Sequence, residues 1–401
     1  MLGSYGPYGH GPAAARSPRK AVGMRTPSGP DDIGRSGPAQ VRAFARTEIG
    51  PYLAEHGEAD YPRPLVRRLA QLGALGATVP VEYGGSGWAR ADVAGIGYEL
   101  GRGWQPLAGL VGTHLKLCRQ VRRHGTPEQR RTWLAPMARG ETVFARAYHE
   151  QGVGHPSRLR SSATRHGGTG VLHGRKSWVT NARDADRILA VARSPHAVLG
   201  VFVDPARPGV VIGPELPRPG MLGVSLAEIA FTGYEFDPDE EVLGGWGHDL
   251  TESLLAHDVT SYVSRALGSA DAVHEQALRF VRDSLDQRPA GVRGAVLLRV
   301  GELATRVAVM RSVRQSLLGP EPPVTPDEAK VFCTAHLQEA VREAALLCGG
   351  AGYAAPETTL GRHYRDALAL LIVGAPNDAL LQRIGERELG VEPGVTVKPD
   401  A

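Results

Sequence analysis

The sequence has few cysteines, few aromatic residues and no long apolar run, and each shortage excludes a class of protein. Its three cysteines (Cys118, Cys333 and Cys348) are too few and too scattered for a disulfide framework or a metal cluster. No stretch approaches the ~18 apolar residues that a membrane-spanning helix requires, and no charged and then apolar leader marks the chain for secretion. We therefore expect a cytoplasmic protein with no membrane segment.

The charge pattern argues against a nucleic-acid partner. Basic and acidic side chains number 46 and 42, and the formal net charge is +4. The two signs are interleaved rather than gathered into the basic stripe that nucleic acid requires. Hydrophobic residues make up 42% of the 401 positions, which is enough for a substantial interior, and a chain of this length is expected to form two or three packed subdomains.

Composition and apolar spacing divide the chain into five parts. The first is rich in Gly, Pro and Ser and lacks periodicity, which predicts disorder. Apolar residues three and four apart then indicate helices, short β-branched runs between turns indicate an antiparallel β unit, and the helical spacing returns afterwards. The predicted parts are a disordered leader (1–35), an N-terminal α-helical domain (36–142), a middle antiparallel β-domain (143–242), a C-terminal four-helix bundle (243–391) and a tail (392–401).

Segregated helical and strand regions predict an α+β enzyme. Local signals support the helix assignments: Thr126, Pro127 and Gln129 have the spacing of a capping box, in which the threonine and the glutamine each satisfy a free backbone amide.

Several motifs, taken in order, resemble those of the acyl-CoA dehydrogenase superfamily. Each motif alone is weak, but five in the same order along residues 37–390 are specific. They are the turn VPVEYGGSG (79–87), the segment HGTPEQRRTWLAPMARGE (124–141), the strand region GVLHGRKSWVTNARDADRILAVAR (170–193), the glycine motif CGGAGY (348–353) and RHYRDALAL (362–370).

The resemblance implies FAD as the cofactor and assigns residues to it. A flavin needs a flat apolar wall and a few polar contacts at its edge, and alternate residues of a strand share one face. By resemblance, Trp178 lies beside the flavin and the Thr180 hydroxyl reaches its N5 atom. Gly349, Gly350 and Gly352 are implied to approach the FAD of a neighbouring subunit in a homodimer or homotetramer, where side chains would clash.

Arg365 and Asp366 are expected to form a structural ion pair beside that glycine motif.

The stretch before the β-domain departs from the family pattern. Relatives usually have T-E-P-x-A-G-S-D, whereas this chain has HEQGVGHP, so His149 stands at the threonine position and His155 at the serine position. The backbone around Tyr148 and His149 is still expected to face the flavin. Because imidazole titrates near neutral pH, His149 is a candidate catalytic residue as well as a cofactor contact, with a packing role as the alternative.

The segment that normally holds the partner's FAD diphosphate, R-x-x-F-G, is also absent. The corresponding stretch is SLDQRPAGVRG, in which Arg288 and Arg293 are candidates for the basic contact.

The usual catalytic base is missing. Removal of the α-proton of a thioester needs a carboxylate, and the position at which relatives carry it is Gly374 here. Asp378 lies nearby, but Asn377 and Asp378 fit a helix N-cap better. Some relatives place the base on a bundle helix instead, and that position is Asp258. A carboxylate in an apolar helical stretch needs a partner or a task, so Asp258 is a candidate base, and a solvated or paired side chain is the alternative.

Three functions follow from these observations. The first is FAD-dependent oxidation, such as α,β-dehydrogenation, of an acyl thioester carried on CoA or an acyl carrier protein, in specialised metabolism. Its electron acceptor is either an electron-transfer flavoprotein or O2. The second is a flavin-dependent monooxygenase or oxidase on the same scaffold, suggested by Gly374 and His149. The third is a catalytically inactive scaffold, suggested by the altered FAD contacts.

Overall fold

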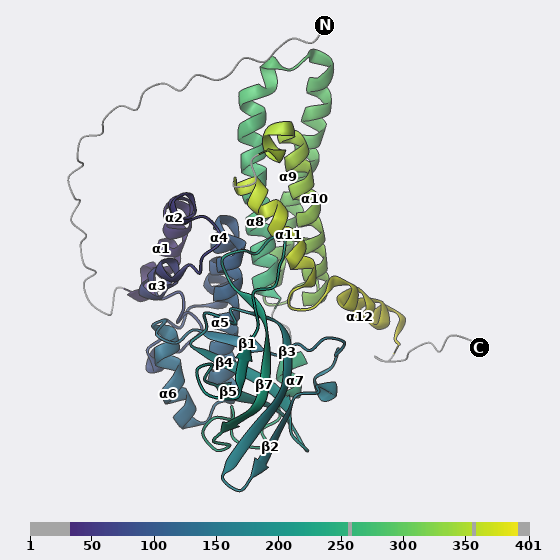
Figure 1. Ribbon diagram of the computed structural model, residues 1–401. Helices are drawn as coiled ribbons and strands as arrows, with labels where there is room; N and C mark the ends of the chain where they lie inside the picture. Colours follow the sequence, from purple (N-terminus) through teal and green to yellow (C-terminus); the bar gives the residue numbers. More distant parts are fainter. Residues whose placement is uncertain (1–32, 256–258, 355–357, 392–401) are drawn as a thin grey trace, which may run out of the picture.

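Helical regions flank a central sheet in the computed structural model, which describes residues 33–255, 259–354 and 358–391 (Figure 1). The predicted leader (1–35) lies outside the described residues up to position 32, and α1 begins at Ile33. The helices before the sheet are α1 (Ile33–Thr47), α2 (Ile49–His56), α3 (Arg63–Gln71), α4 (Arg90–Gly103), α5 (Gln105–His124) and α6 (Pro127–Ala138), with a 3-10 turn η1 (Val81–Tyr83).

The capping box predicted at Thr126 is confirmed. The Thr126 side chain accepts a hydrogen bond from the Gln129 amide, and the Gln129 side chain accepts one from the Thr126 amide. These two bonds satisfy amides that the first turn of α6 leaves free.

Seven strands of the described chain form one sheet, with η2 (Pro156–Arg158) between the first two. Most neighbours are antiparallel, as predicted, but β1 pairs with β4 in parallel and β2 meets β4 in one parallel pair. The strands are β1 (Phe144–Ala147), β2 (Ser162–His166), β3 (Thr169–Thr180), β4 (Arg187–Arg193), β5 (Val198–Val203), β6 (Val210–Ile212) and β7 (Leu226–Phe236).

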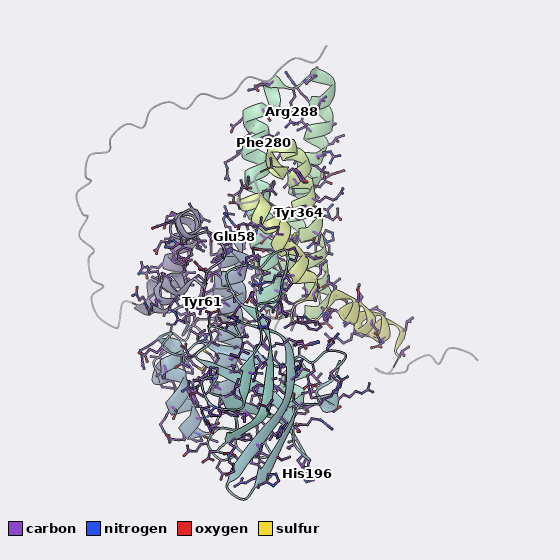
Figure 2. All side chains as sticks on the ribbon, in the orientation of Figure 1. Glu58, Tyr61, His196, Phe280, Arg288 and Tyr364 are labelled. Atoms are coloured by element: carbon purple, nitrogen blue, oxygen red, sulfur yellow. The ribbon has the colours of Figure 1, made fainter. Side chains whose placement is uncertain are left out.

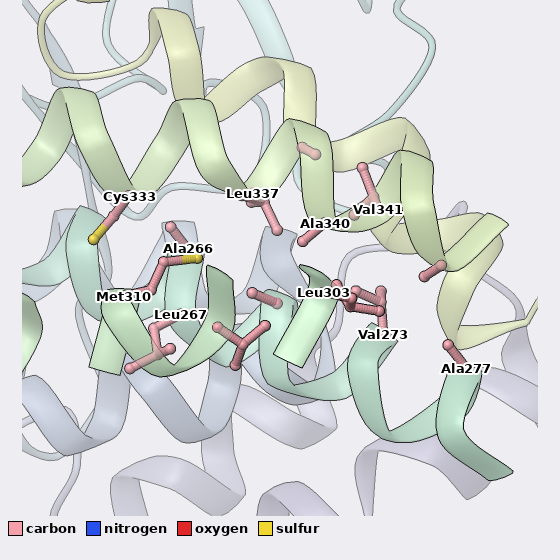
Figure 3. Packing of buried hydrophobic residues seen from close by; sticks show 14 of the residues in the cluster. Ala266, Leu267, Val273, Ala277, Leu303, Met310, Cys333, Leu337, Ala340 and Val341 are labelled. Atoms are coloured by element: carbon pink, nitrogen blue, oxygen red, sulfur yellow. The ribbon is translucent and has the colours of Figure 1, made fainter. Parts of the chain in front are cut away.

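A bundle of long helices forms the C-terminal region. Its core is apolar and includes Val273, Leu303, Met310 and Leu337, which meet between α8, α9 and α10 (Figure 3). The helices after the sheet are α7 (Thr251–Leu255), α8 (Thr260–Ser284), α9 (Ala290–Leu318), α10 (Pro326–Tyr353), α11 (Thr359–Ile372) and α12 (Asn377–Leu389), with a 3-10 turn η3 (Leu285–Gln287).

The N-terminal helices and the bundle meet at a close crossing of α4 and α8. A Cβ atom at Gly268 of α8 would lie 2.2 Å from the Tyr98 carbonyl oxygen of α4, so only glycine permits this approach. A buried polar group extends the contact: Gln105 of α5 donates to Ser269 of α8 over 2.6 Å, and the Ser269 hydroxyl lies 3.0 Å from Nδ1 of His363 on α11. The N-terminal half of α8 is thereby held against α4 and α5.

Candidate functional site

Trp178 presents an uncovered aromatic face at the end of β3. The pairing of β3 with β7 shifts register between Lys176 and Val179, and Trp178 within this bulge has φ 53°, a conformation that is uncommon for a bulky residue. Its side chain is 52% exposed, whereas Val179 is buried in the sheet core and Thr180 is half-buried. Trp178 and Thr180 thus alternate with the core residue, and both point away from the interior of the sheet.

His149 lies against Trp178. Their ring centroids are 4.8 Å apart with the planes tilted by 38°, and the Ser177 amide donates to the His149 carbonyl over 2.9 Å. The segment around His149 is further anchored by Lys176, whose ammonium donates to the Tyr148 carbonyl over 3.3 Å and to the Glu150 carboxylate over 2.7 Å. The rings of His149 and Trp178 therefore lie together, and Tyr148 precedes them in the same anchored backbone; we call these three residues the aromatic wall.

The buried Lys176–Glu150 pair affects the protonation state of His149 in the aromatic wall. Burial lowers the pKa of Lys176, and Glu150 partly offsets this by favouring the ammonium form. Burial opposes ionisation of Glu150 too, but hydrogen bonds from Lys176, Ser161 and Arg160 leave its pKa below the ordinary value. Desolvation and then the Lys176 charge lower the pKa of His149, so its imidazole is neutral near pH 7.

His155 lies away from the contacts of the aromatic wall. Its Nδ1 atom is 2.8 Å from the Ser157 hydroxyl and accepts from the Ser157 amide over 3.3 Å, and in this position it caps the turn η2. These bonds give the exposed imidazole a local structural role, and its predicted cofactor contact stays a prediction.

A cavity of about 650 Å³ opens between the N-terminal helices and the start of the bundle. Its walls are mainly apolar, and Arg90, Arg119 and Arg122 add positive charge. Further lining residues are Trp88, Ala94, Val111, Leu115, Thr260 and Ser261. The cavity therefore lies where helices of the N-terminal and C-terminal regions meet.

Gly374, the position at which relatives carry the base, faces Tyr262. A Cβ atom at Gly374 would lie 2.5 Å from Tyr262 Cζ and 2.7 Å from its hydroxyl oxygen, and the backbone there has φ 82°. The Tyr262 ring thus occupies the space that a side chain at Gly374 would enter. Asp258, the alternative base, lies outside the described residues; Thr260 and Ser261 at the start of α8 line the cavity.

The predicted N-cap at Asn377 and Asp378 is wrong. Helix α12 begins at Asn377 after Pro376, without a side-chain cap. The Asn377 side chain accepts from the buried Lys330 ammonium over 2.8 Å instead, because this tertiary partner competes successfully for its oxygen.

Two arginines with Tyr262 as a neighbour, the buried Arg265 and the partly buried Arg146, were missed by the sequence analysis. Arg265 lies with its Cζ 5.9 Å from the Tyr262 ring centroid, and burial lowers its pKa to about 10. Arg146 on β1 has Tyr148 and Tyr262 as electrostatic neighbours, and burial lowers its pKa. The signal for Arg146 was its place between alanines in the apolar run FARA, where a charged residue is unexpected.

The glycine motif lies on the bundle, at the end of α10 that points away from the sheet (Figure 1). Gly349 kinks the helix with φ 57° and ψ −140°, and no atom of the described residues outside the local helix backbone lies within 4 Å of a Cβ atom at Gly349 or Gly350. A Cβ at Gly352 would lie 2.8 Å from Cys348 Cβ. A shallow hollow of about 560 Å³ beside the motif includes Gly352 and Arg279. One chain does not bring this motif to the aromatic wall.

Arg288 and Arg293, the candidates for the basic contact to the partner's FAD, both bind backbone carbonyls within the chain. Arg288 lies at the tip of the bundle (Figure 2), where it donates to the Leu347 carbonyl over 3.3 Å, and Arg293 donates to the carbonyls of Asp286 and Arg288. Their predicted FAD contacts stay predictions.

The predicted Arg365–Asp366 ion pair is wrong. Arg365 pairs with Glu58 at 2.7 Å, and the Asp366 carboxylate accepts from the Met221 amide. Adjacent side chains on a helix diverge, and each meets a different loop.

No group of three or more His, Cys, Asp or Glu side chains is placed to hold a metal ion within the described chain. No single helix of the described residues is long and apolar enough to cross a membrane, although α11 and α12 together, bent by 43°, meet the length and composition criteria.

Comparison with known proteins identifies three consecutive matches to family models. Residues 38–141 match the acyl-CoA dehydrogenase N-terminal domain, residues 145–234 the middle domain and residues 245–389 the C-terminal domain. Together they cover most of the chain in the order expected from its motifs.

Individual relatives agree with these models. The chain is 28% identical over 348 residues to human mitochondrial short-chain specific acyl-CoA dehydrogenase, covering 81% of this chain and 82% of the relative. It is 26% identical over 352 residues to a 3-(aryl)acrylate reductase of Clostridium sporogenes, covering 83% and 92%. The acyl-CoA dehydrogenase of Geobacillus kaustophilus superposes with a TM-score of 0.79 at 25% identity, over 88% of this chain and 97% of that one.

Proposed function

Because the chain belongs to the acyl-CoA dehydrogenase family of flavin oxidoreductases, we propose that it binds FAD and oxidises an acyl group in thioester linkage. The carrier is CoA or an acyl carrier protein, and the reaction is an α,β-dehydrogenation in specialised metabolism. The observation that carries this proposal is the mainly apolar cavity of about 650 Å³ between the N-terminal helices and the first turn of α8, where Thr260 and Ser261 line it.

The aromatic wall has the chemistry that a flavin needs. The half-exposed Trp178 indole offers a flat surface, and the adjacent Thr180 hydroxyl offers a hydrogen-bond donor. The Lys176–Glu150 pair fixes the backbone of Tyr148 and His149 beside that surface. When bound there, FAD supplies the acceptor for hydride from the substrate β-carbon.

The α-proton needs a base, and Gly374 provides none. We propose Asp258, which precedes two residues that line the cavity. His149 is neutral at pH 7 and is the second candidate for proton transfer. We further propose that His149, Tyr148, Trp178 and Thr180 contact the cofactor.

The decisive experiment is rapid mixing of the purified, FAD-loaded protein with a panel of acyl-CoA and acyl-carrier-protein thioesters. We expect at least one thioester to bleach the flavin, and Asp258→Asn to slow the bleaching by ~100-fold or more, the range of general base catalysis. Arg139→Gln, an exposed change on another surface, is the control. Failure of every thioester would overturn the proposal, and an undiminished rate in Asp258→Asn would remove that residue from it.

The Gly374–Tyr262 contact favours a second candidate. A phenol in place of the base is compatible with an oxidase or monooxygenase that uses O2 with the reduced cofactor. Reduced protein mixed with O2 and candidate substrates would then yield a hydroxylated product. Rapid reoxidation without any hydroxylated product would exclude the monooxygenase, and slow reoxidation would favour an electron-transfer flavoprotein as the acceptor. Purified protein that holds stoichiometric FAD would exclude the inactive scaffold.

We also propose a homodimer or homotetramer. Tyr364, Leu368 and Ile372 are spaced four apart along α11 and are between 50% and 60% exposed in the single chain (Figure 2 labels Tyr364). An apolar stripe of this kind is suited to a subunit interface. Such contacts would bring the glycine motif of one subunit near its neighbour, as the resemblance implies. Light scattering measures the state, and Leu368→Asp is expected to shift it toward the monomer.

A further inference from the structure

Two histidines that are far apart in the sequence meet at the end of α5. The Nδ1 atom of His124, the last residue of α5, lies 3.0 Å from Nε2 of His248, in the loop of residues 244–250 that precedes α7. The other ring nitrogen of His124 lies 2.9 Å from the hydroxyl of Ser253 on α7. The two rings are half-buried, with centroids 5.2 Å apart and planes tilted by 55°, so they meet through their nitrogens and not through their faces. We call His124 and His248 the histidine pair.

The backbone of the loop is shaped to hold this contact. A Cβ atom at Gly244 would lie 2.6 Å from the His248 ring and 2.8 Å from the His124 carbonyl oxygen, and the backbone there has φ 82°. Only glycine therefore permits the His248 ring to lie against the end of α5. The loop has a second attachment at Gly244, whose amide donates to the Gln129 side chain of α6 over 3.0 Å. One attachment of the loop is thus titratable and the other is neutral.

The hydrogen bond of the histidine pair depends on how many protons the two rings carry. In a neutral pair one ring donates its N–H and the other accepts, and a single added proton is compatible with the same bond. Once both rings are protonated, two N–H groups and two positive charges face each other across 3.0 Å. The bond therefore exists only where at least one of the two rings can accept.

The charges around the histidine pair agree with a change in mild acid. Burial and then the His248 and Arg123 charges lower the pKa of His124, which favours its neutral form in the closed contact. Asp249 has His248 as an electrostatic neighbour; burial opposes its ionisation, but its hydrogen bonds leave its pKa below the ordinary value. Asp249 thus stays ionised at pH 5 and does not itself produce the change. The charged residue of α7, Glu252, is exposed.

We propose that the histidine pair is a pH-sensitive latch, which holds the loop of residues 244–250 against the end of α5 at neutral pH and releases it in mild acid. The loop leads into α7 and then into α8, whose residues Thr260 and Ser261 line the cavity, and α5 lines the cavity as well. The latch therefore connects one wall of the cavity with the segment that leads into another wall. This inference concerns the fold and does not depend on the proposed function.

The test is hydrogen exchange of the full chain with FAD at pH 7.5 and 5.0, resolved to single amides and expressed as protection relative to the intrinsic rate at each pH. The reporters are the amides of Gly245 and His248, which donate to the Val242 and Gly245 carbonyls. A proton taken up on opening favours the open loop by up to about 10-fold per pH unit below the ordinary histidine pKa of about 6.5. We expect protection of both amides to fall about 10-fold or more, and that of the Gly244 amide, held by Gln129, to fall less than about 3-fold.

The variant His248→Gln separates the latch from general effects of acid. Glutamine still offers hydrogen-bonding groups to His124 but has no second ring to protonate, so the fall at Gly245 is expected to shrink to less than about 3-fold. His196→Gln, at an exposed histidine, is the matched control and is expected to keep the wild-type fall. An undiminished fall in His248→Gln, or no fall in the wild type, overturns the inference. An equal fall at Gly244 in the wild type also overturns it, and that comparison needs no variant to fold.

Discussion

The hydroxyl of Tyr262 lies 2.7 Å from the point at which a Cβ atom of Gly374 would stand. The two residues belong to different parts of the bundle, since Tyr262 is in the first turns of α8 and Gly374 follows α11. A side chain at position 374 and the tyrosine ring cannot both occupy this space. The Tyr262 ring therefore occupies the space that a side chain at position 374 would need.

Gly374→Ala is predicted to destabilise the protein. The positive φ and the overlap with Tyr262 together are expected to cost ~2–4 kcal/mol, measured by urea unfolding. Gly385→Ala is the control, because Gly385 is helical and nothing lies within 4 Å of its Cβ position; it is expected to be neutral or to stabilise α12 by ~0.5–1 kcal/mol. Equal changes in the free energy of unfolding for Gly374→Ala and Gly385→Ala would show that the Tyr262 ring moves aside at little energetic cost.

Loss of Lys176 is predicted to damage both stability and the aromatic wall. In Lys176→Met the Glu150 carboxylate, which is 4% exposed, remains buried without its cation. The expected cost is ~3–5 kcal/mol, with weaker retention of flavin because the Tyr148–His149 backbone is released. Adding Glu150→Gln should recover part of the stability. Arg139→Ala at the exposed Arg139–Glu141 pair should change it by less than ~0.5 kcal/mol.

Two buried histidines predict a loss of stability in mild acid. Burial lowers the pKa of both His114 and His363 to about 4 from 6.5. Between these values the unfolded chain binds more protons, so this contribution is complete above pH 6.5 and is lost as the pH falls toward 4. Each imidazole accounts for roughly 3 kcal/mol, at about 1.4 kcal/mol per pKa unit. Asp366 acts in the opposite direction, because burial raises its pKa to about 6.

Thermal unfolding from pH 7.5 to 4.5 tests this dependence. We expect His114→Gln and His363→Gln to have a shallower pH dependence than the wild type. His196→Gln is the control, since that ring is exposed near the tip of the sheet (Figure 2). Parallel profiles for all four proteins would contradict the assignment.

Lys330 is predicted to hold the loop that contains Gly374. Its ammonium donates to the carbonyls of Leu371 and Ala375 over 3.3 and 2.8 Å, and to Asn377 over 2.8 Å. Lys330→Met removes the donor to the Leu371 and Ala375 carbonyls and leaves Asn377 Oδ1 with only the Thr334 hydroxyl, at an expected cost of ~2–4 kcal/mol. Hydrogen exchange should accelerate at residues 371–377, whereas Gln382→Met, exposed on α12, should leave it unchanged. Unchanged exchange in both would mean that packing alone holds the loop.

The sequence by itself determined the family, the α+β architecture and the local devices. Helical spacing, β-branched runs and the capping box at Thr126 act over a few residues, so their physical basis is visible in the letters. The shared face of Trp178 and Thr180 was also predictable, because residues two apart on a strand point to the same side. The predicted Asn377–Asp378 cap and the Arg365–Asp366 pair failed because distant partners, Lys330, Met221 and Glu58, took those side chains.

Only the tertiary structure decided what surrounds the missing base. No local pattern connects Gly374 with Tyr262, or Arg146 with the first turn of α8, since these contacts depend on the packing of segments far apart in the chain. Whether a buried arginine has a partner is likewise a property of the assembled interior, where water is excluded and every neighbour is fixed. The sequence therefore placed the absence at Gly374, and the fold showed that the Tyr262 ring fills the space beside it.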